Sequence, residues 1–91
     1  MARRHDLPLL PPFHSYIAFT SIDPARNRRR AYRIVIVPMD RAYAVVTYRG
    51  RVSGTQQVLI EPCTTWEAAM ELAERRAHDR LLHGYTVESA A

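Results

Sequence analysis

Two arginines separated by one glycine are the residues of this sequence best suited to bind an anion. They lie in the segment 43–57, which reads Tyr-Ala-Val-Val-Thr-Tyr-Arg-Gly-Arg-Val-Ser-Gly-Thr-Gln-Gln. With the two-residue period of a β-strand, Arg49 and Arg51 fall on the same face, so that two guanidinium groups would stand in a row. That face also carries Tyr43, Val45 and Thr47. We expect the opposite face to join the core; it carries Ala44, Val46, Tyr48, Gly50 and Val52.

A second group of arginines follows a predicted turn. The residues Asp23-Pro24-Ala25-Arg26-Asn27 suit a turn, because proline fixes φ and asparagine tolerates a left-handed backbone. Three consecutive arginines after a turn form either a solvated loop or a phosphate clamp. We favour the clamp, because we expect their strand to lie beside the Arg49–Arg51 face. The candidate nucleic-acid-binding residues are Arg26, Arg28, Arg29, Arg30, Arg33, Tyr43, Arg49 and Arg51, with Tyr43 as the stacking side chain.

Other kinds of site find little support in the sequence. Cys63 is the single cysteine, and it has neither a second thiol nor a nearby histidine that would activate it. His78 and His83 are five residues apart, which places them on different faces of a helix and argues against a metal pair. No glycine-rich phosphate loop and no nucleophile–base arrangement is present. We therefore expect a protein that is not an enzyme and that needs no cofactor or metal.

The charge is distributed unevenly along the 91 residues. The net charge is +4, and every basic residue is an arginine. Residues 1–60 hold ten arginines against three aspartates, which gives +7, whereas residues 61–91 hold three arginines against six acidic residues, which gives −3. Such asymmetry favours a polyanion on one side of the molecule, although general solubility explains a modest net charge equally well.

The hydrophobic pattern predicts one α+β domain over residues 16–91, preceded by a proline-rich extended arm over residues 1–15. Strands are expected over 16–22, 31–37, 43–52 and 56–60, the last of them ended by Pro62, and a short edge strand over 85–88. In the arm, we expect disorder as far as His5. The arm suits either a ligand of a proline-reading domain or docking of its apolar residues on the chain's own core. Those apolar residues are Leu9, Leu10 and Phe13.

One helix is expected after Thr64, which forms a capping-box pattern with Glu67. Gly84 is the expected C-terminal cap. Apolar residues recur at helical spacing along one side, and the alanines among them would let the helix lie close to a sheet. That side carries Trp66, Ala69, Met70, Ala73, Ala77 and Leu81. We thus expect a twisted antiparallel sheet of four to five strands with one helix on one face, and joint burial of Ile34, Ile36, Val46, Tyr48, Trp66, Met70 and Ala73.

The compartment is predicted from what the sequence lacks. A single cysteine allows no internal disulfide and fits a reducing cytoplasm. No apolar run approaches the length of a membrane span, and the N-terminus lacks the apolar core of a signal peptide. We therefore expect a cytoplasmic protein that does not contact a membrane.

From Ile22 onward the sequence resembles the WGR domain, a small module that accompanies poly(ADP-ribose) polymerases and also occurs alone in bacteria. The resemblance covers about two-thirds of the chain in the right order. It rests on Asp23-Pro24-Ala25-Arg26-Asn27, Arg29-Arg30, Tyr32, Gly50-Arg51-Val52, Gln57, Glu67-Ala68 and Gly84-Tyr85. It implies an antiparallel sheet with one packed helix, and a small bacterial module that binds DNA.

The chain departs from the WGR pattern at the residue that gives the family its first letter. Arg49 stands where the family has tryptophan, and Ser53 and Gln56 stand where glycine is common. In the polymerases that tryptophan packs on the sugar at a DNA end, so this chain would instead contact phosphate or stack a guanidinium plane. Two functions remain: a nucleic-acid-binding module, with DNA as the favoured partner, and a protein-interaction module that recognises an acidic partner.

Overall fold

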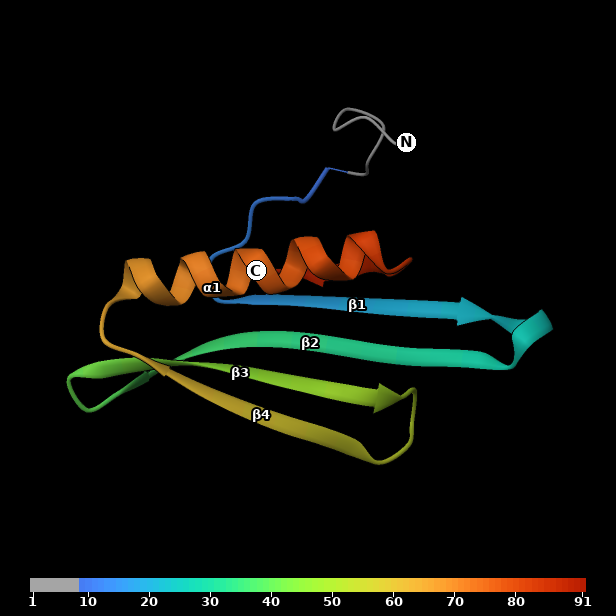
Figure 1. The fold of residues 1–91 in the computed structure, drawn as a ribbon, viewed down its shortest axis with the longest axis horizontal. Coiled ribbons are helices and arrows are strands. Elements are labelled where there is room, and N and C mark those ends of the chain that lie inside the picture. Colours follow the sequence, from blue (N-terminus) through green and yellow to red (C-terminus); the bar gives the residue numbers. More distant parts are fainter. Residues whose placement is uncertain (1–8) are drawn as a thin grey trace.

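The computed structural model describes residues 9–91, which form one antiparallel sheet of five strands with a single helix packed on one face (Figure 1). The strand order is β4-β3-β2-β1-β5, so that β4 and β5 are the edges. The predicted α+β fold is confirmed. In chain order the elements are β1 (Tyr16–Asp23), η2 (Pro24–Arg26, a single 3-10 turn), β2 (Arg28–Met39), β3 (Ala42–Arg51), β4 (Gln56–Cys63), α1 (Trp66–Leu82) and β5 (Thr86–Ala90).

The β2–β3 hairpin forms the centre of the sheet. Its turn is made by Asp40 and Arg41, and Arg41 adopts a left-handed backbone with φ 56°. The strand predicted over 31–37 runs two residues further, so that Pro38 lies inside β2, opposite Tyr43. The strand continues through this proline to Met39, so the hairpin is longer than its sequence pattern indicates.

The β3–β4 hairpin depends on Gly50. A Cβ added to this glycine would collide with the backbone carbonyl oxygen of Thr55, in the loop that joins the two strands. Gly50 therefore permits the loop backbone to approach β3 closely. The left-handed residue of the loop is Ser53, with φ 61°.

The helix begins one residue later than predicted. Its N-cap is Thr65, whose hydroxyl oxygen accepts a hydrogen bond from the N–H of Ala68 at 3.1 Å. The C-terminal end is closed by Gly84, where φ is 82°, and by bonds from the Gly84 and Tyr85 N–H groups to the carbonyl oxygens of Leu81 and Arg80. This pair of bonds is the Schellman motif, and it explains why a glycine follows the helix.

The core lies between α1 and the sheet, and small residues on the helix allow close contact. Ala69, Ala73 and Ala77 are completely buried, as predicted. Trp66 and Met70 are only half-buried and pack against the edge of the core. The sheet contributes Ile17, Phe19, Tyr32, Ile34, Ile36 and Val45.

The predicted phase of β3 is wrong. Directly opposite residues of an antiparallel pair share a face, and the register places Thr47 opposite Ile34 and Val45 opposite Ile36. Val45 and Thr47 therefore face the helix, whereas Val46 and Tyr48 face the other way. Val46 is buried on that opposite face, and Tyr48 is half-exposed. Both sets of alternating residues contain apolar side chains, so periodicity alone did not select the correct face.

The described part of the arm supports the docking interpretation. Leu10 and Phe13 pack against the core, whereas Leu9 is 90% exposed. The N–H groups of His14 and Ser15 donate to the carbonyl oxygen of Ala91, at 3.0 and 2.9 Å, and tie the arm to the end of the sheet. The disorder predicted as far as His5 lies outside the described residues.

Candidate nucleic-acid interface

Beyond the last turn of α1, the sheet continues and carries a group of arginines on its helix-facing side. In Figure 1 the strands β1 and β2 extend past the end of the helix toward η2. Register places Arg30 opposite Arg51, and Tyr32, which is buried beneath the helix, opposite Arg49. Arg49 and Arg51 therefore lie on the helix-facing side of the sheet, contrary to the prediction that they would face away from the core. The arginine cluster comprises Arg28, Arg30, Arg49 and Arg51.

The turn that precedes β2 is held by its own side chains. The Asp23 carboxylate accepts a hydrogen bond from the N–H of Ala25 at 3.2 Å, and Asn27 adopts a left-handed backbone with φ 52°. Arg51 reaches across from β3 and donates to the Asn27 backbone carbonyl oxygen at 3.2 Å and to its side-chain oxygen at 3.5 Å. Two segments that are 24 residues apart in sequence are thus joined at the edge of the cluster.

Neutral partners orient two other guanidinium groups. Arg49 Nε donates to Gln57 Oε1 at 3.1 Å, and Arg28 Nε donates to Ser21 Oγ at 2.7 Å. The Arg28 guanidinium also lies 5.6 Å from the centre of the Tyr85 ring. These uncharged partners fix the orientation of each guanidinium group but do not neutralise its positive charge. Such an arrangement suits an anion-binding surface.

No carboxylate within residues 9–91 forms an ion pair with any arginine of the cluster. The acidic groups of the neighbouring elements have other partners: Asp23 pairs with Arg26 at 3.6 Å, Asp79 pairs with Arg80 at 3.3 Å, and Glu61, at the other end of β4, pairs with Arg76 at 2.5 Å. The hydrogen bond and charge of Glu61 raise the pKa of Arg76. Arg30 and Arg51, directly opposite each other, repel, so this arrangement does not stabilise the fold.

An open hollow of about 590 Å³ lies over the cluster. Its walls include Arg30, Arg49 and Arg51 from the sheet, and Arg80 and Tyr85 from the end of the helix and the segment that follows. The guanidinium of Arg80 lies 4.6 Å from the centre of the Tyr32 ring and 5.3 Å from that of Tyr85. An anion in this hollow would meet charges from β2, β3 and α1.

Sequence analysis missed Arg80 and Tyr85. Arg80 lies in the acidic half of the chain, next to Asp79, with which it forms an ion pair at 3.3 Å. The signal that could have found it is its position three residues after Ala77, which puts it on the side of α1 that faces the sheet. Tyr85 follows Gly84, and the reversal of the chain there directs its ring back over Tyr32.

Three predicted residues lie elsewhere. Arg29 faces the opposite side of the sheet, opposite Ile22, and is exposed. Arg33 also faces that side, with its guanidinium 4.2 Å from the centre of the Tyr48 ring. Tyr43 shares a face with the cluster but lies at the other end of the helix, where its ring packs against Trp66 at 5.5 Å. Arg26 is at the rim of the cluster, and its side chain is 83% exposed.

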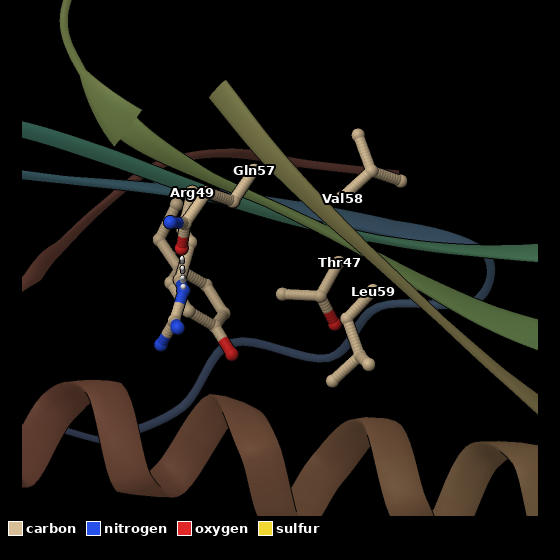
Figure 2. A pocket seen from close by; sticks show the side chains of 6 residues that line it. Thr47, Arg49, Gln57, Val58 and Leu59 are labelled. Carbon is tan, nitrogen blue, oxygen red and sulfur yellow. Dashed lines mark hydrogen bonds between the residues drawn. The ribbon is translucent and has the colours of Figure 1, made fainter. Parts of the chain in front are cut away.

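A second hollow of about 320 Å³ adjoins the cluster beneath the β3–β4 pair (Figure 2). In Figure 2, Thr47, Arg49 and Leu59 point toward the helix and Val58 points away from it. Thr47 is 3% exposed, and its hydroxyl oxygen has no hydrogen-bond partner among the described residues. Arg49 and Gln57, joined by their hydrogen bond, line both this mostly apolar hollow and the charged one.

Among residues 9–91, no group of three or more histidine, cysteine, aspartate or glutamate side chains is placed to hold a metal ion. In the same range, no helix has both the length and the apolar character needed to cross a membrane.

No family model matches this chain, and neither curated proteins nor solved structures give a significant match. The WGR resemblance therefore stays a prediction that rests on the residues quoted above.

Proposed function

We propose that this chain is a small non-catalytic module that binds nucleic acid, with DNA as the favoured ligand, through phosphate contacts made by the arginine cluster. The observation that carries the proposal is the convergence of four guanidinium groups from two strands with no carboxylate partner in the described chain. Arginine binds phosphate through paired N–H groups, and each such contact releases counterions from DNA.

Several of the residues that resemble a WGR domain lie at this cluster, which supports the proposal. Asn27 ends the Asp23–Asn27 turn, Arg51 belongs to the Gly50-Arg51-Val52 segment, and the two side chains are in contact. Tyr85 lies beside Arg28. Because Arg49 replaces the family's tryptophan, we expect phosphate contact to dominate over stacking on a terminal sugar. We assign the module to the cytoplasm, where Cys63 would stay reduced.

The test measures binding to duplex, nicked and single-stranded DNA at a series of salt concentrations, with fluorescence anisotropy as the signal. With four phosphate contacts, the slope of log affinity against log salt should be roughly −3 to −4 for duplex DNA. Arg30→Gln and Arg51→Gln should each flatten this slope by about one. Arg75→Gln is the matched control, because Arg75 is exposed on α1 outside the cluster, and its slope should equal that of the parent.

Polyglutamate, measured at the same salt concentrations, distinguishes phosphate from carboxylate ligands. Tighter binding to polyglutamate than to DNA would favour an acidic protein partner over nucleic acid. Undetectable DNA binding at low salt would overturn the proposal. So would a double variant, Arg30→Gln with Arg51→Gln, that binds DNA as well as the parent.

A further inference from the structure

The edge strand β4 presents free backbone hydrogen-bonding groups and, from Gln56 to Ile60, a sequence without charged residues. It forms one side of the sheet, the lower one in Figure 1, and none of the described residues pairs with its outer side. Val58, Leu59 and Ile60 are 54%, 52% and 59% exposed. Exposed edges are normally protected by charges, bulges or prolines, and between Gln56 and Ile60 this strand has none of these.

The hydrogen bonds of the sheet determine which backbone N–H and C=O groups of β4 point away from β3. The Val52 N–H donates to the Arg29 carbonyl oxygen at 2.8 Å, so even-numbered residues of β3 bond to β2. Odd-numbered residues of β3 therefore bond to β4, where their partners are Gln57, Leu59 and Glu61. Residues 56, 58 and 60 must then direct their N–H and C=O groups outward.

Pro62 agrees with this assignment. It pairs with Ala44, an even-numbered residue of β3, so its missing N–H would point to solvent, where the ladder loses nothing. For the same reason Pro62 lies within the strand, although the sequence pattern predicted that it would end the strand.

The opposite edge differs. β5 has an irregular register with β1 between Ala18 and Phe19, and it carries Glu88. Both features discourage the addition of another strand.

We propose that β4 pairs in antiparallel fashion with β4 of a second copy of this chain, about a two-fold axis at Leu59. This register places Val58 opposite Ile60 of the other copy, and both would exchange backbone hydrogen bonds. Leu59 faces Leu59 in a non-hydrogen-bonded pair, on the helix-facing side of both sheets. The result is one continuous sheet of ten strands, and this inference does not depend on the proposed function.

Charge complementarity favours a second copy as the occupant. An antiparallel arrangement places Gln57 opposite Glu61 of the other copy, so no like charges face each other. The arginine cluster adjoins the start of β4, whereas Glu61 and Glu67 lie at the end of β4 and the start of α1. The arginine cluster of each molecule is thus brought toward the acidic end of the other, and the two clusters lie at opposite ends of the assembly.

Sedimentation of the folded chain tests association directly. A strand-edge interface falls in the class below about 1,200 Å², so measurements should extend from about 5 to about 300 µM. We expect a monomer–dimer equilibrium in this range. Ile60→Lys should weaken dimerisation at least about tenfold, because a charge on the edge discourages pairing. Ile22→Lys is the matched control, since Ile22 is 55% exposed and lies in β1; it should dimerise like the parent.

Disulfide trapping tests the register in a Cys63→Ser background. In the proposed pairing the two Leu59 Cα atoms are about 4.5 Å apart, which a disulfide can bridge. Leu59→Cys should therefore give a covalent dimer on oxidation. Gln57→Cys should not, because its two copies would be about 14 Å apart. A chain that stays monomeric at all concentrations, equal weakening by Ile22→Lys, or cross-linking at residue 57 but not at 59 would overturn the proposal.

Discussion

Replacement of Thr47 by valine should stabilise this protein. Thr47 is 3% exposed and lies opposite Ile34 on the helix-facing side of β3, and its buried hydroxyl oxygen has no hydrogen-bond partner among residues 9–91. A buried polar group with no hydrogen bond costs roughly 1–3 kcal/mol in proteins. Valine keeps the branched shape, replaces the hydroxyl by a methyl group and suits a strand at least as well.

We expect a gain of about 1.5 kcal/mol in the free energy of unfolding, which in a domain of this size raises Tm by about 6–12 °C. The measurement is thermal and urea unfolding followed by circular dichroism. Thr47→Ser is the control, because it keeps the hydroxyl and removes the methyl group, and it should lose about 1 kcal/mol. A Thr47→Val protein that is less stable than the parent would refute the reasoning and would mean that the adjoining hollow supplies a hydrogen-bond partner.

Three further changes test other parts of the structure. Gly50→Ala should cost about 1–3 kcal/mol in unfolding free energy, because the added Cβ collides with loop backbone; an unchanged urea midpoint would contradict the close approach. Phe13→Ala should lower Tm measurably, whereas Leu9→Ala, at a side chain 90% exposed, should leave it unchanged; equal effects would show that the arm is not docked. Glu61→Gln should cost about 1 kcal/mol or less, because the side chain of Arg76 is 39% exposed. The pKa of Arg76 is raised in the folded protein, so the stabilisation that its charge gives through the ion pair is present below the ordinary guanidinium pKa and is lost only above it. Titration of Arg76 should therefore not change the stability difference between Glu61→Gln and the parent from about pH 7 to about pH 10.

Local patterns were sufficient for the elements themselves. The Asp23–Asn27 turn, the alternation along Tyr32, Ile34 and Ile36, and the alanine face of the helix all appear in the structure as predicted. Each depends on interactions within a few residues, namely turn chemistry, the two-residue period of a strand and the helical repeat. The sequence by itself therefore determined the fold class and most of the boundaries.

The tertiary structure decided which face of β3 meets the helix. Val45 and Thr47 alternate with Ala44 and Val46, so both faces were apolar enough for a core, and only the pairing of Val45 with Ile36 selects one. That choice moved Arg49 and Arg51 to the helix-facing side.

The composition of the candidate site was likewise decided by tertiary structure. Arg80 and Tyr85 line the hollow over the cluster because α1 ends over the sheet and the chain reverses at Gly84. Tyr43 and Arg33, which were predicted from spacing along the chain, are held elsewhere by Trp66 and Tyr48. The sequence determined that arginines would gather near one hairpin, because their spacing along neighbouring strands can be read from short segments of the chain. Which of them converge depends on strand register, which is set by pairing between residues far apart in the chain.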